Sequence, residues 1–306
     1  MSKALLLRLH RWIAVIFAIP LAIIIVTGLL LSLQPLLQAG SIKPASLTQD
    51  KIESWIQKYD PDNKVRALSV DTYAGTFTLG GGRGERGTVI DTQTGAETTD
   101  RNMLSQVIRS SRGLHEHFLF DLRWVVTWST VAMLFIIAMG IFMGLPRLAN
   151  TMSGWHKITA WTLLPLLFLS ALSGLFMALG VTFSDPAPRG KPVPIREAVR
   201  MLAAQHDLSG LEFIRERGGR QMARINDGTT QRTYLVTPEG LKPAPLNLPR
   251  TFHEGVFFGI WGGVVNLILS LAFALLLTTG LIIWGRRTFR RRRRTRRPEV
   301  AGAAAE

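Results

Sequence analysis

The sequence predicts a membrane protein: a four-helix transmembrane bundle, built by an internal duplication, with two small α+β modules outside the membrane. The 306-residue chain is 47% hydrophobic, and its mean hydropathy is +0.20 although 19% of its residues are charged. That balance is ordinary for a membrane protein with water-exposed parts. Apolar stretches of the roughly 20 residues needed to cross a bilayer lie at 12–33, 124–145, 158–180 and 256–284. Two long polar segments lie between them, and the two halves of the chain resemble each other.

The first apolar stretch is interpreted as a retained membrane helix, so residues 1–34 form an N-terminal tail and the first span. Its apolar core is far longer than that of a secretory signal, and no small-residue cleavage site follows LSLQPLLQ. The other spans are assigned to residues 123–146, 158–180 and 252–285, with a short connection at 147–157 and a basic tail at 286–306.

Each long polar segment, 35–122 and 181–251, predicts a small α+β module. Each opens with apolar residues at helical spacing, in LTQDKIESWIQKY at 47–59 and IREAVRMLAAQHD at 195–207. Strand-like runs follow, and each segment closes with a strand and a glycine turn, TVIDTQTGAE and TYLVTPEGLK. Modules of about 50–60 residues lie near the lower limit for an independent core, so we expect them to lean on each other or on the membrane helices. The glycine-rich GGGRGERG at 80–87 lacks the G-K-[ST] ending of a phosphate loop and is interpreted as a flexible turn.

Basic residues predict the orientation of the chain, whose formal net charge is +15. They crowd the short segments beside the apolar stretches, above all the tail RRTFRRRRRTRR, whereas the two long polar segments are nearly balanced in charge. The positive-inside rule then places both termini and the 147–157 connection in the cytoplasm of a bacterial cell, with the chain crossing the inner membrane several times. A polybasic run just cytoplasmic of a span contacts anionic membrane lipid, so no nucleic-acid partner is predicted.

The internal repeat is visible when His10 is aligned with His156. From His10 to Thr27 is 17 positions, and from His156 to Ser173 is also 17; a Gly-Leu pair follows in both halves. Matching offsets of this kind indicate a duplication.

The second and fourth spans repeat in the same way. LHEHFLF aligns with FHEGVFF, which pairs His115 with His253 and Glu116 with Glu254. The two glutamates either orient these imidazoles or act as favourable acids at helix N-termini. His117 is the alternative to His115, but a glycine stands at its counterpart in the second half, so His115 is preferred.

Four histidines therefore stand where the expected spans begin: His10 and His156 at the cytoplasmic face, His115 and His253 at the outer face. The chain contains no cysteine, which excludes disulfides, thiolate metal sites, iron–sulfur clusters and covalently attached c-type haem. A b-type haem needs two axial imidazoles, commonly supplied by facing helices of a bundle. The pairs predict two haem b groups, with iron held by His10/His156 and by His115/His253. The alternative is that these histidines are interfacial anchors copied by the duplication.

Basic residues near each pair are candidate partners of haem propionates. They are Arg8, Arg11 and Lys157 near the inner pair, and Arg112, Arg123 and Arg250 near the outer pair. Asn266, a polar residue inside the fourth apolar stretch, is interpreted as an interhelical hydrogen-bonder. No Ser-His-Asp order, H-E-x-x-H zinc pair or carboxylate dyad supports hydrolysis, and no catalytic residue is assigned.

Several motifs resemble those of the PepSY-associated transmembrane family: the LHRW opening, the Thr-Gly step ending the first span, the D-x-x-T-G of the first outer segment, and the HE and WHK segments. The resemblance covers residues 3–285 and implies four membrane helices with PepSY modules outside. Some members of this family resemble or are inner-membrane reductases of ferric siderophores, associated with iron uptake and thought to carry b-type haem. The larger siderophore-reductase members are longer than this chain, so its PepSY-like modules are minimal.

Two functions follow from these features. The histidines and the resemblance together predict a haem-dependent electron carrier that takes electrons from a cytoplasmic donor or a quinol and reduces a ferric chelate outside, as a siderophore reductase does. PepSY modules elsewhere are linked to peptidase inhibition, so the alternative is a non-catalytic membrane protein that binds or regulates an envelope partner. A transporter is less well supported, because Asn266 is the main polar group inside a span.

Overall fold

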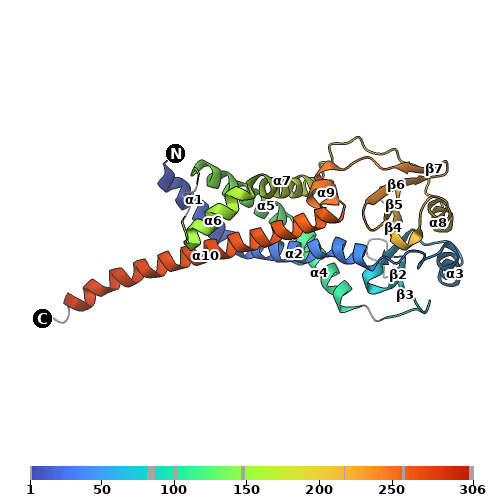
Figure 1. Ribbon diagram of the computed structural model, residues 1–306, viewed down its shortest axis with the longest axis horizontal. Coiled ribbons are helices and arrows are strands. Elements are labelled where there is room, and N and C mark those ends of the chain that lie inside the picture. Colours follow the sequence, from blue (N-terminus) through green and yellow to red (C-terminus); the bar gives the residue numbers. More distant parts are fainter. Residues whose placement is uncertain are drawn as a thin grey trace. The chain divides into compact units, whose positions relative to one another are not determined.

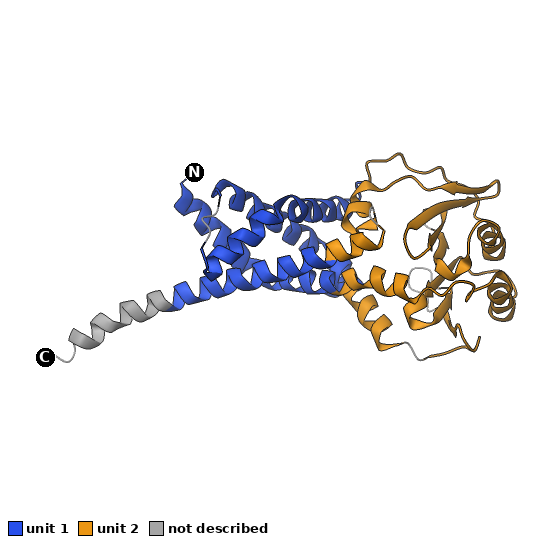
Figure 2. Cartoon of the chain, viewed as in Figure 1, with its two compact units in different colours: residues 1–29, 112–181, 267–306 blue, residues 30–111, 182–266 orange. Residues whose placement is uncertain are grey.

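The computed structural model describes residues 2–80, 87–99, 102–145, 149–216, 218–256 and 259–302; for residues 290–302 it describes the backbone. The chain divides into two compact units (Figure 2). Unit 1 comprises residues 1–29, 112–181 and 267–306, and unit 2 comprises residues 30–111 and 182–266. Most of the glycine-rich turn expected at 80–87 lies outside the described residues.

Long apolar helices support a membrane protein. Three of the described helices are long and apolar enough to cross a bilayer: α2 (Ala18–Ser41), α5 (Arg123–Phe142) and the first part of α10 (Ile260–Gly302) (Figure 1). A further candidate is the pair formed by α6 (Met152–Thr162) and α7 (Leu164–Ala178), which is bent by 68°. The described part of the chain thus holds three spans, or four if the bent pair is one of them.

Two of the expected spans are interrupted. Helix α1 (Lys3–Ile16) gives way to α2 at Phe17, and α6 gives way to α7 at Leu163. Pro20 and Pro165 stand in the first turn of the second helix of each pair. A proline is tolerated in a first turn but cannot continue a preceding helix, because it lacks the N–H and its ring clashes with the earlier carbonyl. The first expected span therefore begins in α1 and continues in α2, which is long enough by itself to cross a bilayer, whereas the third is the bent pair α6–α7.

His115 does not begin the second span, contrary to expectation. It lies in the last turn of α4 (Met103–His117), which is followed by the 3₁₀ turn η2 (Leu119–Asp121) and only then by α5. Phe120 in this turn has a φ of 54°. Such a left-handed residue cannot continue a right-handed helix, so the backbone turns between the histidine and the span.

His253 is likewise separated from the fourth span. It ends the short helix α9 (Leu248–His253), and α10 begins after an intervening turn. Gly255 in this turn has a φ of 71°, a conformation that glycine adopts at little cost. A hydropathy profile does not detect the breaks at Phe120 and Gly255, since phenylalanine and glycine both fit an apolar run.

Unit 2 is built on one seven-stranded antiparallel sheet with the order β3-β2-β1-β4-β5-β6-β7 (Figure 1). The first long polar segment, 35–122, supplies β1 (Ala67–Asp71), the 3₁₀ turn η1 (Thr72–Ala74), β2 (Thr76–Leu79) and β3 (Thr88–Asp91). The second supplies the 3₁₀ turn η3 (Leu208–Gly210), β4 (Leu211–Glu216), β5 (Gln221–Asn226), β6 (Gln231–Thr237) and β7 (Gly240–Pro243). Strands β1 and β4 pair directly, with Leu68 opposite Ile214.

The two long polar segments, 35–122 and 181–251, also share one hydrophobic core. Helices α3 (Gln49–Tyr59) and α8 (Ile195–Ala203) contact each other and pack on the sheet. The fully buried side chains of this core come from both halves and include Ile52, Ile56, Phe77, Leu202 and Ile214. Cores of about 60 residues are marginal by themselves, so joining the segments gives both a larger core. The expected modules are therefore one folded unit.

His206 makes the stability of unit 2 depend on pH. Its ring packs on Tyr234 with centroids 5.1 Å apart, and its buried Nε2 has no hydrogen-bond partner among the described residues. Burial, and secondly Arg232, lower the pKa of this imidazole against a smaller opposing effect of Asp227. The unfolded chain binds this proton near pH 6.5 and the folded chain only at lower pH, so stability falls as the pH drops through about 6.5.

The variant His206→Phe keeps a ring on Tyr234 and removes the titrating group. We expect its thermal unfolding to depend less on pH between about pH 7 and pH 5 than that of the unchanged protein. An equally steep acid dependence in the variant would show that other groups set it.

Candidate functional site

His10 lies on α1 with its ring partly buried against α5. Its Nδ1 is 3.1 Å from the carbonyl oxygen of Ile136. A carbonyl oxygen only accepts hydrogen bonds, so Nδ1 carries the proton and donates it. The lone pair of this imidazole is then on Nε2, the nitrogen that a metal takes when Nδ1 is held by the protein.

His156, on α6, is held in the same way by α10. Its Nδ1 lies 2.9 Å from Thr279 Oγ1. His10 and His156 both belong to unit 1, and each is held by a neighbouring helix of that unit.

His115 points from the last turn of α4 toward α2. Its Nδ1 lies 3.0 Å from the carbonyl oxygen of Ile24 and 3.2 Å from Thr27 Oγ1. The ring also lies against Gly28, where an added Cβ would be 3.1 Å from His115 Cε1. Three of the four predicted histidines thus share one kind of anchorage, in which Nδ1 meets an acceptor on a neighbouring helix.

His117 has different surroundings. Its Nδ1 lies 3.3 Å from Asp121 and its Nε2 lies 3.9 Å from Glu116, both on the same stretch of chain. It thus pairs with local acids, whereas His115 contacts another helix of unit 1. The sequence favours His115 over His117 because of the repeat alone. The contact of His115 with α2 is a second, geometric reason for this preference.

His253 belongs to unit 2, where Asn266 fastens its helix to α10. Asn266 Nδ2 donates a hydrogen bond of 2.8 Å to the carbonyl oxygen of His253. The backbones also approach closely, because a Cβ at Gly262 would collide with the carbonyl of Gly255. Asn266 is therefore a hydrogen-bonder between helices, as expected, and its partner is the backbone of a predicted site residue.

The charged residues near the outer histidines pair with one another. The pairs are Glu116–Arg112 at 3.2 Å, Glu254–Arg250 at 3.7 Å and Asp121–Arg123 at 2.9 Å. All three basic residues expected to meet propionates near the outer pair therefore have carboxylate partners. The corresponding role of Arg8, Arg11 and Lys157 near the inner pair stays a prediction.

Thr27 and Thr279 are the site residues that sequence reasoning missed. Thr27 lies at the matched offset of the repeat, but the repeat assigns no role to Thr27 or Thr279. The available signal was the Thr-Gly step, which occurs at 27–28 and again at 279–280. The role of this step depends on which helix packs against it, and the local sequence does not determine that packing.

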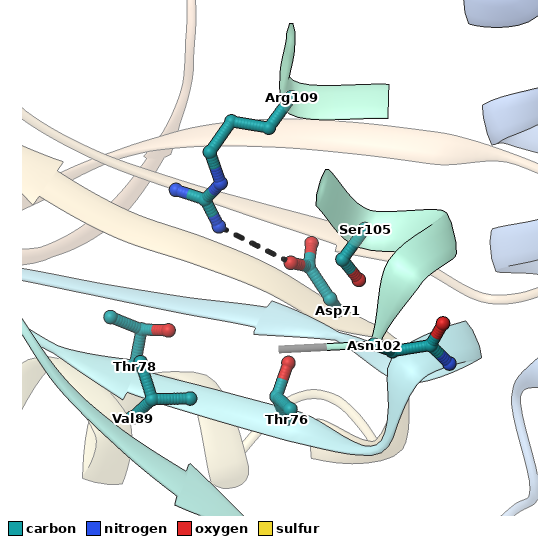
Figure 3. A pocket seen from close by; sticks show the side chains of 7 residues that line it. All are labelled: Asp71, Thr76, Thr78, Val89, Asn102, Ser105 and Arg109. Atoms are coloured by element: carbon teal, nitrogen blue, oxygen red, sulfur yellow. Dashed lines mark ion pairs between the residues drawn. The ribbon is translucent and has the colours of Figure 1, made fainter. Parts of the chain in front are cut away.

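A small hollow with mostly polar lining residues lies between α4 and the sheet of unit 2 (Figure 3). It is lined by Asp71, Thr76, Thr78, Val89, Asn102, Ser105 and Arg109. Arg109 Nη2 lies 3.7 Å from Asp71 Oδ2, and the buried Ser105 hydroxyl has no hydrogen-bond partner among the described residues. The free volume is about 10 Å³, which is about the room that one water molecule needs. The side chains that line the hollow therefore attach α4 to the sheet, and the hollow itself has no space for a chelate.

The chain matches a known protein family over nearly its whole length. The profile of the PepSY-associated TM region matches residues 7–287, a range that includes the apolar helices, the sheet and all four predicted histidines. No curated protein matches the chain. The match confirms the resemblance carried by the sequence motifs, and the chain belongs to the family of the PepSY-associated TM region.

Proposed function

We propose that the protein is an inner-membrane electron carrier that holds two haem b groups and reduces a ferric chelate, such as a ferric siderophore, on the outer side during iron uptake. One observation carries this proposal: His10, His156 and His115 are each held through Nδ1 by a neighbouring helix. Histidines that ligate metals are oriented in this way, because a hydrogen bond from Nδ1 fixes the ring and raises the basicity of Nε2.

The residues present suit a bis-imidazole haem. His10 and His156 come from different helices of unit 1, and the chain has no cysteine for covalent attachment. When bound, haem b supplies an iron that alternates between the ferric and ferrous states. The chain itself provides the two nitrogen ligands, orients their rings through backbone and hydroxyl acceptors, and surrounds them with apolar helices that exclude water.

The direction of transfer follows from the proposed topology. The chain is proposed to arise by duplication, with the bent pair α6–α7 as one of four spans and both termini in the cytoplasm, which the basic tail supports. His10 and His156 would then hold the haem on the side of a cytoplasmic electron donor or a quinol. His115 and His253 would hold the haem on the side of the ferric chelate, whose iron takes up one electron per ferric ion; their pairing across one haem stays a prediction from the repeat.

The visible spectrum of the purified full-length protein tests this function. Protein from haem-replete cells is expected to show a Soret band and a reducible α-band, with haem in a ratio of about two per chain if both pairs bind. A folded, colourless preparation would refute the electron-carrier function. Crosslinking to an envelope protein in that colourless preparation would instead support the non-catalytic alternative.

The outer ligand is tested by a matched pair of variants two residues apart. His115→Ala is expected to lose one of the two haems, since this ring faces α2, whereas His117→Ala should keep both, since His117 pairs with Glu116 and Asp121. Haem content per chain and the reduced-minus-oxidised spectrum are the measurements. If His117→Ala were the variant that lost haem, the assignment of His115 would be wrong.

A further inference from the structure

Two helices of unit 1 each present a threonine hydroxyl and the glycine that follows it to a histidine. In α2 these are the hydroxyl of Thr27 and the backbone of Gly28, which meet His115 beside the carbonyl of Ile24. In α10 they are the hydroxyl of Thr279 and the backbone of Gly280, which meet His156.

The threonine hydroxyls act as acceptors toward the imidazoles. Thr27 Oγ1 lies 2.6 Å from the carbonyl of Ile23, and Thr279 Oγ1 lies 2.6 Å from the carbonyl of Leu275. A hydroxyl has a single proton, and at this distance it donates that proton to the carbonyl four residues earlier. The oxygen can then only accept from the imidazole, so Nδ1 must be the protonated nitrogen of both rings.

The glycines set how closely each ring approaches its helix. A Cβ at Gly28 would lie 3.1 Å from His115 Cε1, tighter than ordinary contact, while a Cβ at Gly280 would lie 3.5 Å from His156 Cε1, an ordinary van der Waals distance. Cε1 is the ring atom between the two nitrogens. A methyl group at position 28 would therefore push on the ring beside Nε2, whereas one at position 280 would leave the ring nearly in place.

We propose that Thr279 and Thr27, with the glycines that follow them, are positioning residues that fix the tautomer and tilt of His156 and His115 and thereby set the reduction potential of the iron that each ligates. The inference rests on the proposed function and goes beyond it, since it assigns the tuning of each haem to a specific hydroxyl. Thr279 has the larger effect, because it is the nearer hydroxyl, at 2.9 Å against 3.2 Å for Thr27.

The sign of the effect follows from the hydrogen bond. Donation from Nδ1 to an acceptor makes Nε2 more basic and favours ferric over ferrous iron. Removing the acceptor therefore raises the potential. A tenfold change in that preference corresponds to 59 mV for a one-electron couple, and losses of second-shell partners change metal affinity by about 10- to 100-fold.

Redox titration of the full-length protein tests the proposal, with potentials followed in the visible spectrum. Thr279→Val removes the hydroxyl at nearly constant volume and should raise one of the two midpoint potentials by about 59 mV or more. Thr279→Ser, which keeps the hydroxyl, should restore the original value, and Thr27→Val should give a smaller rise in the other potential. Gly28→Ala should shift its haem more than Gly280→Ala.

A second measurement keeps the proposal open to refutation if Thr279→Val loses haem. Nitrogen-15 NMR shifts of labelled histidine distinguish the Nδ1–H from the Nε2–H form in the haem-free protein, and Thr279→Val should increase the Nε2–H share of His156. Equal potentials in Thr279→Val and the unchanged protein, or an equal shift in Thr279→Ser, would overturn the positioning role while leaving the haem assignment intact. An absence of haem from the unchanged protein would overturn the proposed function instead, and the NMR result would then decide the tautomer alone.

Discussion

Replacing His10 by alanine is expected to remove one of the two proposed haem groups from the protein. His10 lies on α1 and its ring is fixed by the carbonyl of Ile136 on α5, and alanine offers no nitrogen in its place. The expected loss in affinity for the proposed inner haem is at least about tenfold, since residues that only hydrogen-bond to a metal ligand already change metal affinity by about 10- to 100-fold. Haem content per chain and the number of resolved midpoint potentials measure the result.

The control for this experiment lies on the same helix. Leu9→Ala shortens an exposed side chain beside His10, so it perturbs α1 to a similar degree without touching a nitrogen ligand. It should keep both haems. Full haem content in His10→Ala, with both potentials unchanged, would mean that the inner pair does not hold iron.

Replacing Phe77 by alanine is expected to destabilise the whole of unit 2. Phe77 is fully buried on β2 and its ring lies 5.1 Å from that of Trp55. Loss of a buried phenylalanine costs about 3–5 kcal/mol, because both the transfer free energy and a residual cavity are involved. Since β1 pairs with β4 and the core is shared, the lost stability should be felt in strands of the other half as well.

Amide hydrogen exchange of the full-length protein measures this spread. In Phe77→Ala the amides of β5 and β6 should lose protection together with those of β1 to β3, as expected for one cooperative unit. Phe183→Ala, at an exposed site, is the matched control and should change stability by less than about 0.5 kcal/mol. Unchanged protection of β5 and β6 in the Phe77 variant would show two modules that fold independently.

The sequence predicts the local elements of this protein better than their connections. The helix expected at 47–59 is confirmed as α3, because its apolar residues recur at helical spacing and Thr48 caps its first turn. The pairing of β1 with β4 joins positions far apart in the chain, such as Leu68 and Ile214. Alternation within a strand says which residues share a face, but not which other strand it will meet.

The breaks at Phe17 and Leu163 were missed for a related reason. Hydropathy averages over a window and treats a proline within an apolar run as harmless. Pro20 and Pro165 are harmless for the helices that they begin, but they stop the helices before them. Pro20 and Pro165 do stand at nearly the same distance after His10 and His156, so the matched offset carries a signal that the hydropathy average loses.

For the candidate site, too, the sequence predicts the positions of residues better than their contacts. The repeat in the sequence marks the positions of the four histidines, and His10 and His156 both lie in unit 1. Thr27 and Thr279 were not assigned a role, since a threonine inside an apolar helix most often bonds only to its own backbone. Both do so here as well, and their contact with an imidazole adds a second bond that only the packing of two helices creates.

The joined sheet also has fewer open strand edges than two separate sheets would have. Two separate modules would each expose two bare edges to other chains, and an open strand edge is a template for intermolecular pairing. Pairing of β1 with β4 covers one edge of each half. The edges that remain, β3 and β7, are four residues long, and β7 carries Lys242 and Pro243, residue types that discourage further strands. Each half of the sheet thus covers the edge that the other half would leave open.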